Sequence, residues 1–531
     1  MPWRGPRKEG EFPSLGYQLI DRWHEVLPSP RDESKPFLLT DRQALDVIEW
    51  YAIHPLTGEF IYRRGCSQDA KGTGKSPLEA AKCISELGMD VKFGGWDADG
   101  EPVAVPWGYD GLPSPWVQIA SLSEDQDENT WTPLYYFLTA NDGRAADLLR
   151  LDPGLTRVFH RDKPGAKIEP VTSRAGSREG QPVTYGNLDE TGLMTATNGG
   201  VKLARTIRKN VSKMGGRAYE TTNGYPPGEG TVAEGTHKAS KTQGGILYLQ
   251  REAPRTVDGI EVDLHAPDHI LERALDVPYE GCWWVDTKRL VADIRDPDAP
   301  WADSMRFFFN WNVAPESAFV DITAWETFAA PDRLVEPGEP IGLGFDGSIN
   351  RDCTVLYGVT ADRFVFEIAV WERPAGVEVW KVPRLEVDRV VAETFEQYRV
   401  GRMLCDPAKW WSEIETWAER YGDDVNGDPL VVAFDTNSAR RFAPVCGRFV
   451  TAVNEGVLSH DGKPTLTAHL AACARKKVRL ADDDEDGRTM FVIVKADTRK
   501  IDAAVGAVLA NEAAATMAAP VDTPTWFGAF D

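Results

Sequence analysis

A Gly-rich stretch near residue 70 has the residue types of a phosphate-binding loop. The run Ala70-Lys71-Gly72-Thr73-Gly74-Lys75-Ser76 precedes residues 77–87, which have helical periodicity. Backbone amides in such a turn point at phosphate oxygens, and the dipole of the following helix favours negative charge. We expect Lys75 to reach the β- and γ-phosphates and the Ser76 hydroxyl to bind Mg²⁺. Alone, the motif also fits a simple turn followed by a helix N-cap.

An acidic pair farther along the chain has the residue types that ATP hydrolysis requires. Asp189 and Glu190 follow a short extended run, 182–185. A carboxylate at a strand end can hold the water shell of the metal, and an adjacent glutamate can polarise the attacking water. Asp189 and Glu190 fit these roles in that order, and a solvated acidic turn is the structural alternative.

Two more strand ends complete this pattern. Residues 116–120 are predicted to form a strand that leads into a capped helix. Thr221, Thr222 and Asn223 offer hydroxyl and amide groups that could sense a γ-phosphate, although they also fit a strand running into a turn. The four strand-to-loop elements occur in the order of a P-loop ATPase, and together they predict ATP hydrolysis.

Three aspartates in the C-terminal half suggest a second chemistry. Asp346 and Asp406 end predicted strands, and Asp502 opens the last predicted helix. Neighbouring strands lie about 4.8 Å apart, so we expect the three carboxylates to converge on two cations about 3.5–4 Å apart. Such a site would activate water and stabilise the leaving 3′-oxygen of a phosphodiester.

Each of these aspartates also has a structural alternative. Asp346 fits a turn, Asp406 fits the end of a strand before Pro407, and Asp502 fits a partner of the helix dipole. Asp352 is a weaker fourth candidate, and the acidic run 482–486 is interpreted as a solvated loop. His469 either lines the groove or is a packed or surface histidine, and we favour the latter.

The predicted elements that position these residues differ between the two halves. The first half has predicted helices at 17–26 and 41–52, an irregular excursion at 90–115, and loops at 160–182 and 223–245. In the second half, three strands precede alternating helices and strands, which is the order of a ribonuclease H-like α/β domain. The predicted strands are 341–345, 354–360, 363–371, 400–405, 430–434 and 490–494; the predicted helices are 384–398, 412–421, 439–453, 465–477 and 501–514.

Length and composition limit the remaining possibilities. The 531 residues favour two or three domains, and we place the main boundary in the Pro- and Glu-rich passage 331–340. The net charge of −23 argues against a generally basic nucleic-acid coat but not against a local groove. Seven cysteines without a CxxC pair predict reduced thiols in a cytosol-like compartment. No HExxH motif supports a zinc site, and no apolar run is long enough to span a bilayer.

With both sets of motifs, the chain resembles the large terminase subunits of tailed bacteriophages, which are ATP-driven DNA-packaging motors. The resemblance begins at Phe37-Leu38-Leu39-Thr40 and covers most of the chain. Asp69 departs from the family at the position of the first Walker glycine. The residues that match the family's motifs are Gln43 on the adenine side, Lys71, Gly72, Gly74, Lys75 and Ser76 in a degenerate Walker A, Ser123 to Gln126, Asp189 and Glu190, Thr221 to Asn223, and the nuclease acids Asp346, Asp406 and Asp502.

The resemblance implies a P-loop (ASCE-type) ATPase domain followed by a ribonuclease H-like nuclease domain. The implied ranges are a lead-in at 1–40, an ATPase domain at 41–335 with a small lid or linker near its end, and a nuclease at 336–531. It implies ATP and Mg²⁺ as cofactors, with Mn²⁺ possible at the nuclease site. The implied partners are double-stranded viral DNA, the portal protein, the small terminase subunit and further copies in a ring, often of five, in the host cytoplasm. Arg64, Arg144 and Arg157 all remain candidates for the arginine that acts in trans.

Three other functions remain open. A repair or recombination ATPase–nuclease would share both sites but would not depend on a portal. A non-catalytic adaptor for a portal or DNA end would retain a decayed ATPase and would not turn over ATP. A lone ribonuclease H-like transposase is disfavoured, because residues 1–330 would then have no task.

Overall fold

The chain folds into two compact units, Met1–Val313 and Ala314–Asp531. The predicted boundary at 331–340 is therefore too late, because Phe319, Ile322 and Trp325 are buried in a hydrophobic core of the second unit. The computed structural model describes residues 3–122, 124–172, 179–296, 298, 300–314, 317–348, 353–374, 377, 380–478, 490–496 and 499–517.

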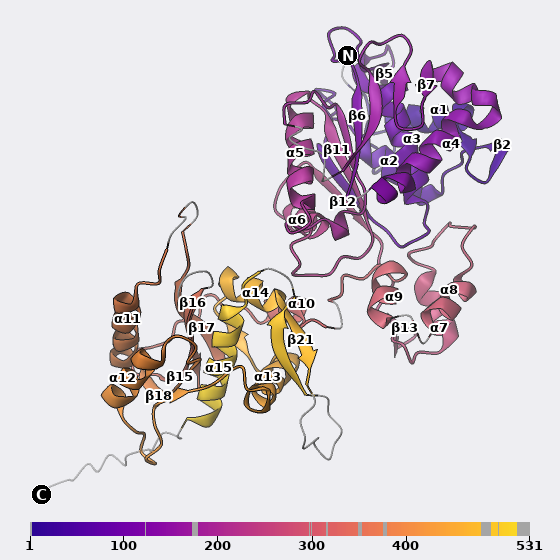
Figure 1. The fold of residues 1–531 in the computed structure, drawn as a ribbon. Helices are drawn as coiled ribbons and strands as arrows, with labels where there is room; N and C mark the ends of the chain where they lie inside the picture. The colour runs from indigo at the N-terminus through magenta and orange to yellow at the C-terminus, as the bar shows by residue number, and fades with distance from the viewer. Residues whose placement is uncertain are drawn as a thin grey trace, which may run out of the picture. The chain divides into compact units, whose positions relative to one another are not determined.

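The first unit is built on an eight-stranded sheet with the order β12-β3-β11-β10-β6-β9-β8-β7 (Figure 1). The six strands from β12 to β9 are parallel, so the loops that follow them leave one edge of the sheet. One strand, β11, separates the P-loop strand β3 from β10, as in an ASCE-type ATPase, which confirms this part of the predicted α/β fold class. The bounds are β3 (Arg64–Gln68), β6 (Trp116–Ser121), β7 (Leu151–Pro153), β8 (Val158–His160), β9 (Lys167–Thr172), β10 (Tyr185–Leu188), β11 (Arg217–Thr222) and β12 (Ile246–Gln250).

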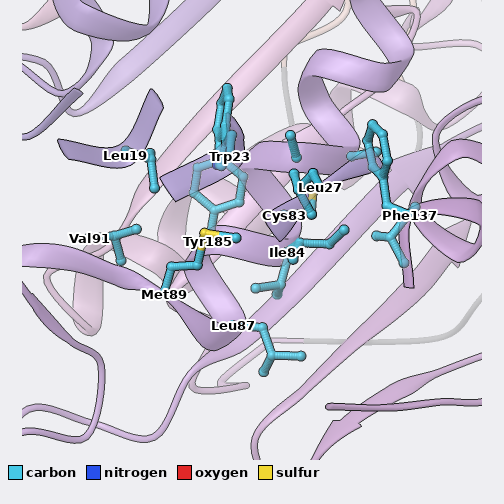
Figure 2. Packing of buried hydrophobic residues seen from close by; sticks show 14 of the residues in the cluster. Leu19, Trp23, Leu27, Cys83, Ile84, Leu87, Met89, Val91, Phe137 and Tyr185 are labelled. Atoms are coloured by element: carbon cyan, nitrogen blue, oxygen red, sulfur yellow. The ribbon is translucent and has the colours of Figure 1, made fainter. Parts of the chain in front are cut away.

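Helices cover this sheet and bury apolar side chains against it. Figure 2 shows Leu19 and Trp23 of α1 beside Cys83 and Ile84 of α3 and Phe137 of α4. Residues 15–37 therefore contribute to the core of the first unit rather than forming a separate lead-in. The bounds are α1 (Gly16–Val26), β1 (Pro28–Ser29), β2 (Asp32–Pro36), α2 (Asp41–Trp50), α3 (Lys75–Gly88), α4 (Glu124–Leu149), the 3-10 helix η1 (Thr191–Leu193), α5 (Gly200–Lys213) and α6 (Val232–Ser240).

A small lid follows β12 and has a hydrophobic core of its own. Ile270, Leu271, Phe309 and Trp311 are buried in this core, and Ala70 of the Gly-rich loop packs with them. The lid occupies the place where the sequence predicts a small lid or linker. Its elements are β13 (Thr256–Val257), β14 (Ile260–Glu261), α7 (Asp268–Leu275), α8 (Thr287–Ile294) and α9 (Trp301–Phe307).

Three segments of the first unit are more regular than predicted. The excursion 90–115 contains a hairpin of β4 (Asp90–Trp96) and β5 (Pro102–Pro106), and Val91 of β4 and Trp107 just after β5 are buried in the core. The predicted loop 160–182 contains β9, and the predicted loop 223–245 contains α6, whose N-cap Thr231 accepts a hydrogen bond from the Glu234 amide.

The second unit has a six-stranded sheet with the order β19-β18-β15-β16-β17-β20. The β15-β16-β17 meander is antiparallel, whereas β18 and β19 run parallel to β15, as predicted for a ribonuclease H-like domain. The bounds are β15 (Pro340–Asp346), β16 (Thr354–Thr360), β17 (Phe364–Trp371), β18 (Arg399–Cys405), β19 (Val431–Ala433), β20 (Ser459–His460), β21 (Cys473–Lys477) and β22 (Phe491–Lys495).

The last helix lies directly against the meander. A Cβ atom on Gly344 would lie 2.0 Å from the Gly506 carbonyl oxygen, so only glycine allows this approach of α15 to β15. The predicted helix 465–477 is wrong in its second half, because α14 ends at Ala471 and Cys473 begins a strand that pairs with β22. The helices are α10 (Ile322–Thr327), α11 (Arg384–Gln397), α12 (Trp411–Tyr421), α13 (Ala439–Asn454), α14 (Pro464–Ala471) and α15 (Asp502–Thr516).

None of the seven cysteines forms a disulfide. Among the described residues, no helix is long and apolar enough to cross a membrane.

Candidate active sites

The Gly-rich loop joins β3 to α3 with the backbone geometry of a phosphate cradle. Gly72 and Gly74 have φ angles of 91° and 89°, a region that favours glycine. Lys75 Nζ donates to the carbonyl oxygens of Asp69, at 2.8 Å, and Ala70, at 3.0 Å. Burial lowers the pKa of Lys75, while the neighbouring carboxylate of Glu190 opposes this shift. The ammonium group is therefore held inside the loop that would wrap the phosphates.

Asp69, at the position of the first Walker glycine, is held by an arginine from the end of the sheet. Arg251 pairs with the Asp69 carboxylate at 2.9 Å and also with Asp46 of α2. Burial raises the pKa of Asp46 to about 6, although the Arg251 guanidinium acts against this shift. The Asp69 carbonyl oxygen also accepts from Asn223 Nδ2 at 2.7 Å. Arg251 thus connects the Gly-rich loop to α2, and no motif in the sequence marks it.

Replacing Arg251 with alanine is expected to destabilise the first unit. The change removes the ion-pair partner that Asp46 and Asp69 share inside the protein, which typically costs about 3–5 kcal/mol. A calorimetric scan of the full chain should show a lower melting temperature for one transition. Arg251→Lys should restore only part of the lost melting temperature, because an ammonium group lacks the forked guanidinium geometry that reaches two carboxylates. A melting profile identical to that of the exposed control Arg289→Ala would contradict this role.

The acidic pair lies at the same edge of the sheet as the Gly-rich loop. Asp189 follows β10 and is buried, and its two carboxylate oxygens accept from Thr130 Oγ1, at 3.1 Å, and Thr221 Oγ1, at 2.6 Å. Glu190 has a left-handed backbone, with a φ of 54°. Burial raises the pKa of Glu190, and the positive charge of Lys75 acts in the opposite direction. Lys75 and Glu190 therefore lie within electrostatic reach of each other, as the predicted topology requires.

A cleft of about 860 Å³ brings most of the predicted nucleotide-site residues together. Gln43 Nε2 donates to the Thr73 carbonyl oxygen at 3.1 Å, so the side chain that caps α2 also contacts the Gly-rich loop. Asp189 and Thr222 do not line the cleft, and the Thr222 hydroxyl bonds to the backbone of Gly192 and Asn223. The predicted residues that line it are Gln43, Lys71, Gly72, Gly74, Lys75, Ser76, Glu190 and Asn223.

The lid contacts the Gly-rich loop directly. The Lys71 amide donates to the Phe307 carbonyl oxygen at 2.7 Å, and the Trp284 indole donates to the Gly72 carbonyl oxygen at 2.8 Å. Arg306 is close enough to Glu190 for its charge to lower the pKa of that carboxyl group. Trp284, Phe307 and Arg306 follow the β12 strand without a recognisable motif, so sequence reasoning missed them.

The three arginine candidates occupy different surroundings. Arg64 pairs with Glu220 at 3.6 Å and Arg157 with Glu169 at 3.1 Å, whereas Arg144 is exposed. Ser123 and the side chain of Gln126 lie outside the described residues.

The three nuclease candidates lie on elements that meet at one end of the second sheet. Asp346 ends β15 and Asp406 follows β18, and Phe345 and Cys405 are partners in the parallel pairing. The Asp406 amide donates to the Phe345 carbonyl oxygen at 2.9 Å, and the Asp406 carboxylate accepts from the Thr436 hydroxyl. Burial raises the pKa of the Cys353 thiol to about 12, and the charges of Asp502 and Asp346 add to this shift. Asp346 and Asp502 are thus both near Cys353.

The three aspartates, which are predicted to converge, do not form a metal site in this conformation. Within the ranges that the structure describes, no group of three or more His, Cys, Asp or Glu residues could hold a metal ion. Asp346 and Asp406 nevertheless offer oxygen ligands at adjacent strand ends, which suits Mg²⁺ or Mn²⁺. Asp352 and the run 482–486 lie outside the described residues.

His469 has the packed role that the sequence favours. Its Nδ1 accepts from the Ala503 amide at 2.9 Å, next to Asp502, and burial lowers its pKa to about 4. A neutral ring in this position can accept the amide hydrogen at the start of α15.

Several solved structures to which this chain is similar are large terminases or parts of them. The HK97 bacteriophage large terminase has 14% identity and a TM-score of 0.48, and the match covers 94% of this chain and 99% of that one. The large terminase of a thermophilic bacteriophage, in complex with ATP-gamma-S, has 10% identity and a TM-score of 0.34, with 89% and 98% covered. The large terminase nuclease of the thermophilic phage G20c, with bound magnesium, has 14% identity and a TM-score of 0.27, with 37% and 98% covered.

Two phage proteins are similar over nearly the whole chain. No protein-family model matches the sequence. The gene 13 protein of Mycobacterium phage L5 is 30% identical over 519 residues, which is 90% of this chain and 84% of that protein. The gene 13 protein of Mycobacterium phage D29 is 30% identical over 514 residues, which is 89% and 83% of the two chains. The chain therefore belongs to the family of the mycobacteriophage gene 13 proteins.

Proposed function

We propose that this chain is the large terminase subunit of a bacteriophage. In this function, ATP hydrolysis drives double-stranded viral DNA into the procapsid, and a metal-dependent nuclease cuts the concatemer before and after packaging. The observation that carries the proposal is the placement of Lys75 and Glu190 on one cleft, in a chain whose second unit has the ribonuclease H-like strand order.

The residues of the first unit have separable roles in ATP hydrolysis. Lys75 and the amides at the start of α3 bind the phosphates, and Gln43 would contact the adenine. Ser76 and Asp189 would hold Mg²⁺, which neutralises charge on the β- and γ-phosphates when bound. Glu190 polarises the attacking water. The Asn223 side chain donates to the Asp69 carbonyl oxygen. A movement of the Gly-rich loop after loss of the γ-phosphate would therefore be transmitted through this hydrogen bond to β11.

The second unit is proposed to cut the phosphodiester backbone. Asp346, Asp406 and Asp502 would hold Mg²⁺, with Mn²⁺ as an alternative, once their side chains converge. Bound divalent ions would lower the pKa of the attacking water and stabilise the leaving oxygen. The Thr436 hydroxyl donates to the carboxylate of Asp406 and so helps to orient it.

The raised pKa of Glu190 predicts the pH dependence of ATP turnover. The carboxylate must be ionised to polarise water, so turnover is lost as the pH falls through its pKa. Because burial raises this pKa above the ordinary 4.5, the acid limb of kcat is expected above pH 4.5. Steady-state phosphate release measured across a pH series would test this. A rate that stays flat down to pH 4.5 would contradict the assignment.

The proposed partners are the portal protein, the small terminase subunit and further copies of this chain in a ring, often of five. The experiment that tests the function is ATP hydrolysis by the full chain with duplex DNA, in the presence and absence of portal protein. We expect DNA to stimulate turnover and portal protein to increase it further. DNA-stimulated turnover that is unchanged by portal protein would instead favour a repair or recombination translocase. No turnover under any condition would favour a non-catalytic adaptor.

A further inference from the structure

One helix of the first unit presents a purely cationic face to solvent. The sequence of α5, Gly200–Lys213, contains no aspartate or glutamate. The four exposed basic residues are Lys202, Arg205, Lys209 and Lys213. We call these four side chains the cationic face. Such a face is unusual in a chain whose net charge is −23, because its positive charge is not part of a generally basic surface.

The cationic face is a continuous stripe along the helix. The spacing of its residues places all four on one side, opposite the buried Leu203, Ile207 and Val211. From Lys202 to Lys213 the helix rises about 16 Å. Duplex DNA carries a phosphate about every 3.4 Å along each strand. The stripe is therefore long enough to meet several phosphates of one duplex.

The four side chains have no acidic partner among the described residues. Arg208, on the flank of the stripe, shows the contrast, because it pairs with the buried Glu220 and bonds to Thr236. A structural role in neutralising buried carboxylates thus explains Arg208 but not the cationic face.

The stripe also borders a groove. A hollow of about 630 Å³ is lined by Arg205, Lys209 and Lys213 on one side and by the start of α6 on the other. A Cβ atom on Gly230 or Gly235 would meet no atom within 4 Å, so this wall leaves open space. Figure 1 shows α5 and α6 near each other beside the sheet. A bound backbone would therefore meet charge on one side and little steric obstruction on the other.

The walls of the groove are bonded to the strand that also serves the nucleotide site. Arg208 of α5 and Thr236 of α6 both contact Glu220 of β11. The next residue, Thr221, donates to Asp189 at 2.6 Å. A shift of β11 after loss of the γ-phosphate would thus reach both walls of the groove.

We propose that the cationic face and the groove beside it bind the phosphate backbone of double-stranded DNA. This inference rests on the proposed function for the identity of the polyanion, since the cationic face itself shows only a row of cations, without acidic partners in the described part of the chain, that matches a regular anionic polymer. Lysine and arginine contacts to phosphates carry no base specificity. Binding at this site should therefore depend on salt and not on sequence.

The test is duplex binding by the full-length double variant Arg205→Ala/Lys209→Ala, measured by fluorescence anisotropy over a salt series in EDTA, which prevents cutting. Loss of two phosphate contacts should weaken binding equally for duplexes of different sequence and reduce the slope of log K against log salt by about 2. The matched control is Lys288→Ala/Arg289→Ala on the exposed side of α8, which should bind like wild type. Arg205→Lys/Lys209→Arg keeps both charges and should also bind like wild type.

ATP turnover distinguishes this inference from the function on which it rests. If the double variant keeps the wild-type salt slope while DNA still stimulates ATP turnover, the groove serves another anion, such as an acidic protein, and the inference is overturned. If the slope falls as expected but wild type shows no DNA-stimulated turnover, the groove assignment stands and the motor function fails.

Discussion

Replacing Glu190 with glutamine is expected to lower kcat for ATP hydrolysis by about 10²–10⁴-fold. The amide has nearly the same shape as the carboxylate. It lacks the negative charge that polarises the attacking water, and it cannot accept a proton from that water. Lys75, Ser76 and Gln43 remain in the cleft, so nucleotide affinity should change little. Phosphate release at saturating ATP and binding of a fluorescent nucleotide would separate the two effects.

The control for this substitution is Glu25→Gln, on the exposed side of α1, which should hydrolyse ATP at the wild-type rate. Metal-dependent DNA cutting by Glu190→Gln should also stay measurable, since Glu190 belongs to the first unit. An unchanged kcat would remove Glu190 from the reaction, and loss of DNA cutting would show that the two activities are not divided as proposed.

Replacing Asp406 with alanine is expected to produce the opposite pattern. Loss of a carboxylate that would hold the metal removes several kcal/mol of transition-state stabilisation, or roughly a hundredfold or more in rate. Cutting of plasmid DNA in Mg²⁺ or Mn²⁺ should therefore be lost, while ATP turnover should stay near that of wild type. Gel analysis of plasmid cutting and phosphate release measure the two activities.

Asp423→Ala is the matched control, because it removes an exposed aspartate from the same unit. It should cut DNA as wild type does. Cutting that survives in Asp406→Ala, or that is lost equally in Asp423→Ala, would contradict the assignment of Asp406 as a metal ligand.

Local patterns in the sequence were sufficient for much of the fold. The strands of the second unit are short apolar runs bounded by turn residues, and β16 has the predicted bounds of Thr354–Thr360. The Gly-rich loop could be predicted because its chemistry depends on consecutive residues. The acidic pair could be predicted because Asp189 and Glu190 are adjacent and follow a strand.

Features that depend on distant contacts could not be predicted in this way. Arg251 bonds to Asp69 across 182 residues, so no local spacing connects them. The domain boundary was misplaced because Phe319 and Trp325 precede the Pro-rich passage but are buried in the second core. The strand β21 ends in Arg475-Lys476-Lys477, and its pairing with β22 rather than its composition determines its structure.

The nuclease site lies between these two cases. Topology correctly placed Asp346 and Asp406 at adjacent strand ends, because parallel pairing fixes where the strands finish. Whether side chains converge depends on rotamers and on the bound cations, which strand order does not determine. The described residues accordingly hold no group of three metal-ligating side chains, although the elements that carry the three aspartates meet at one end of the sheet.

The proposed pair of activities is tested most directly by anomalous diffraction from crystals of the full chain grown with Mn²⁺. We predict two Mn²⁺ peaks about 3.5–4 Å apart, bound by the carboxylates of Asp346, Asp406 and Asp502 together. Mn²⁺ bound elsewhere, or by only one of these carboxylates, would contradict the nuclease assignment and with it the proposal of a packaging motor that also cuts its DNA.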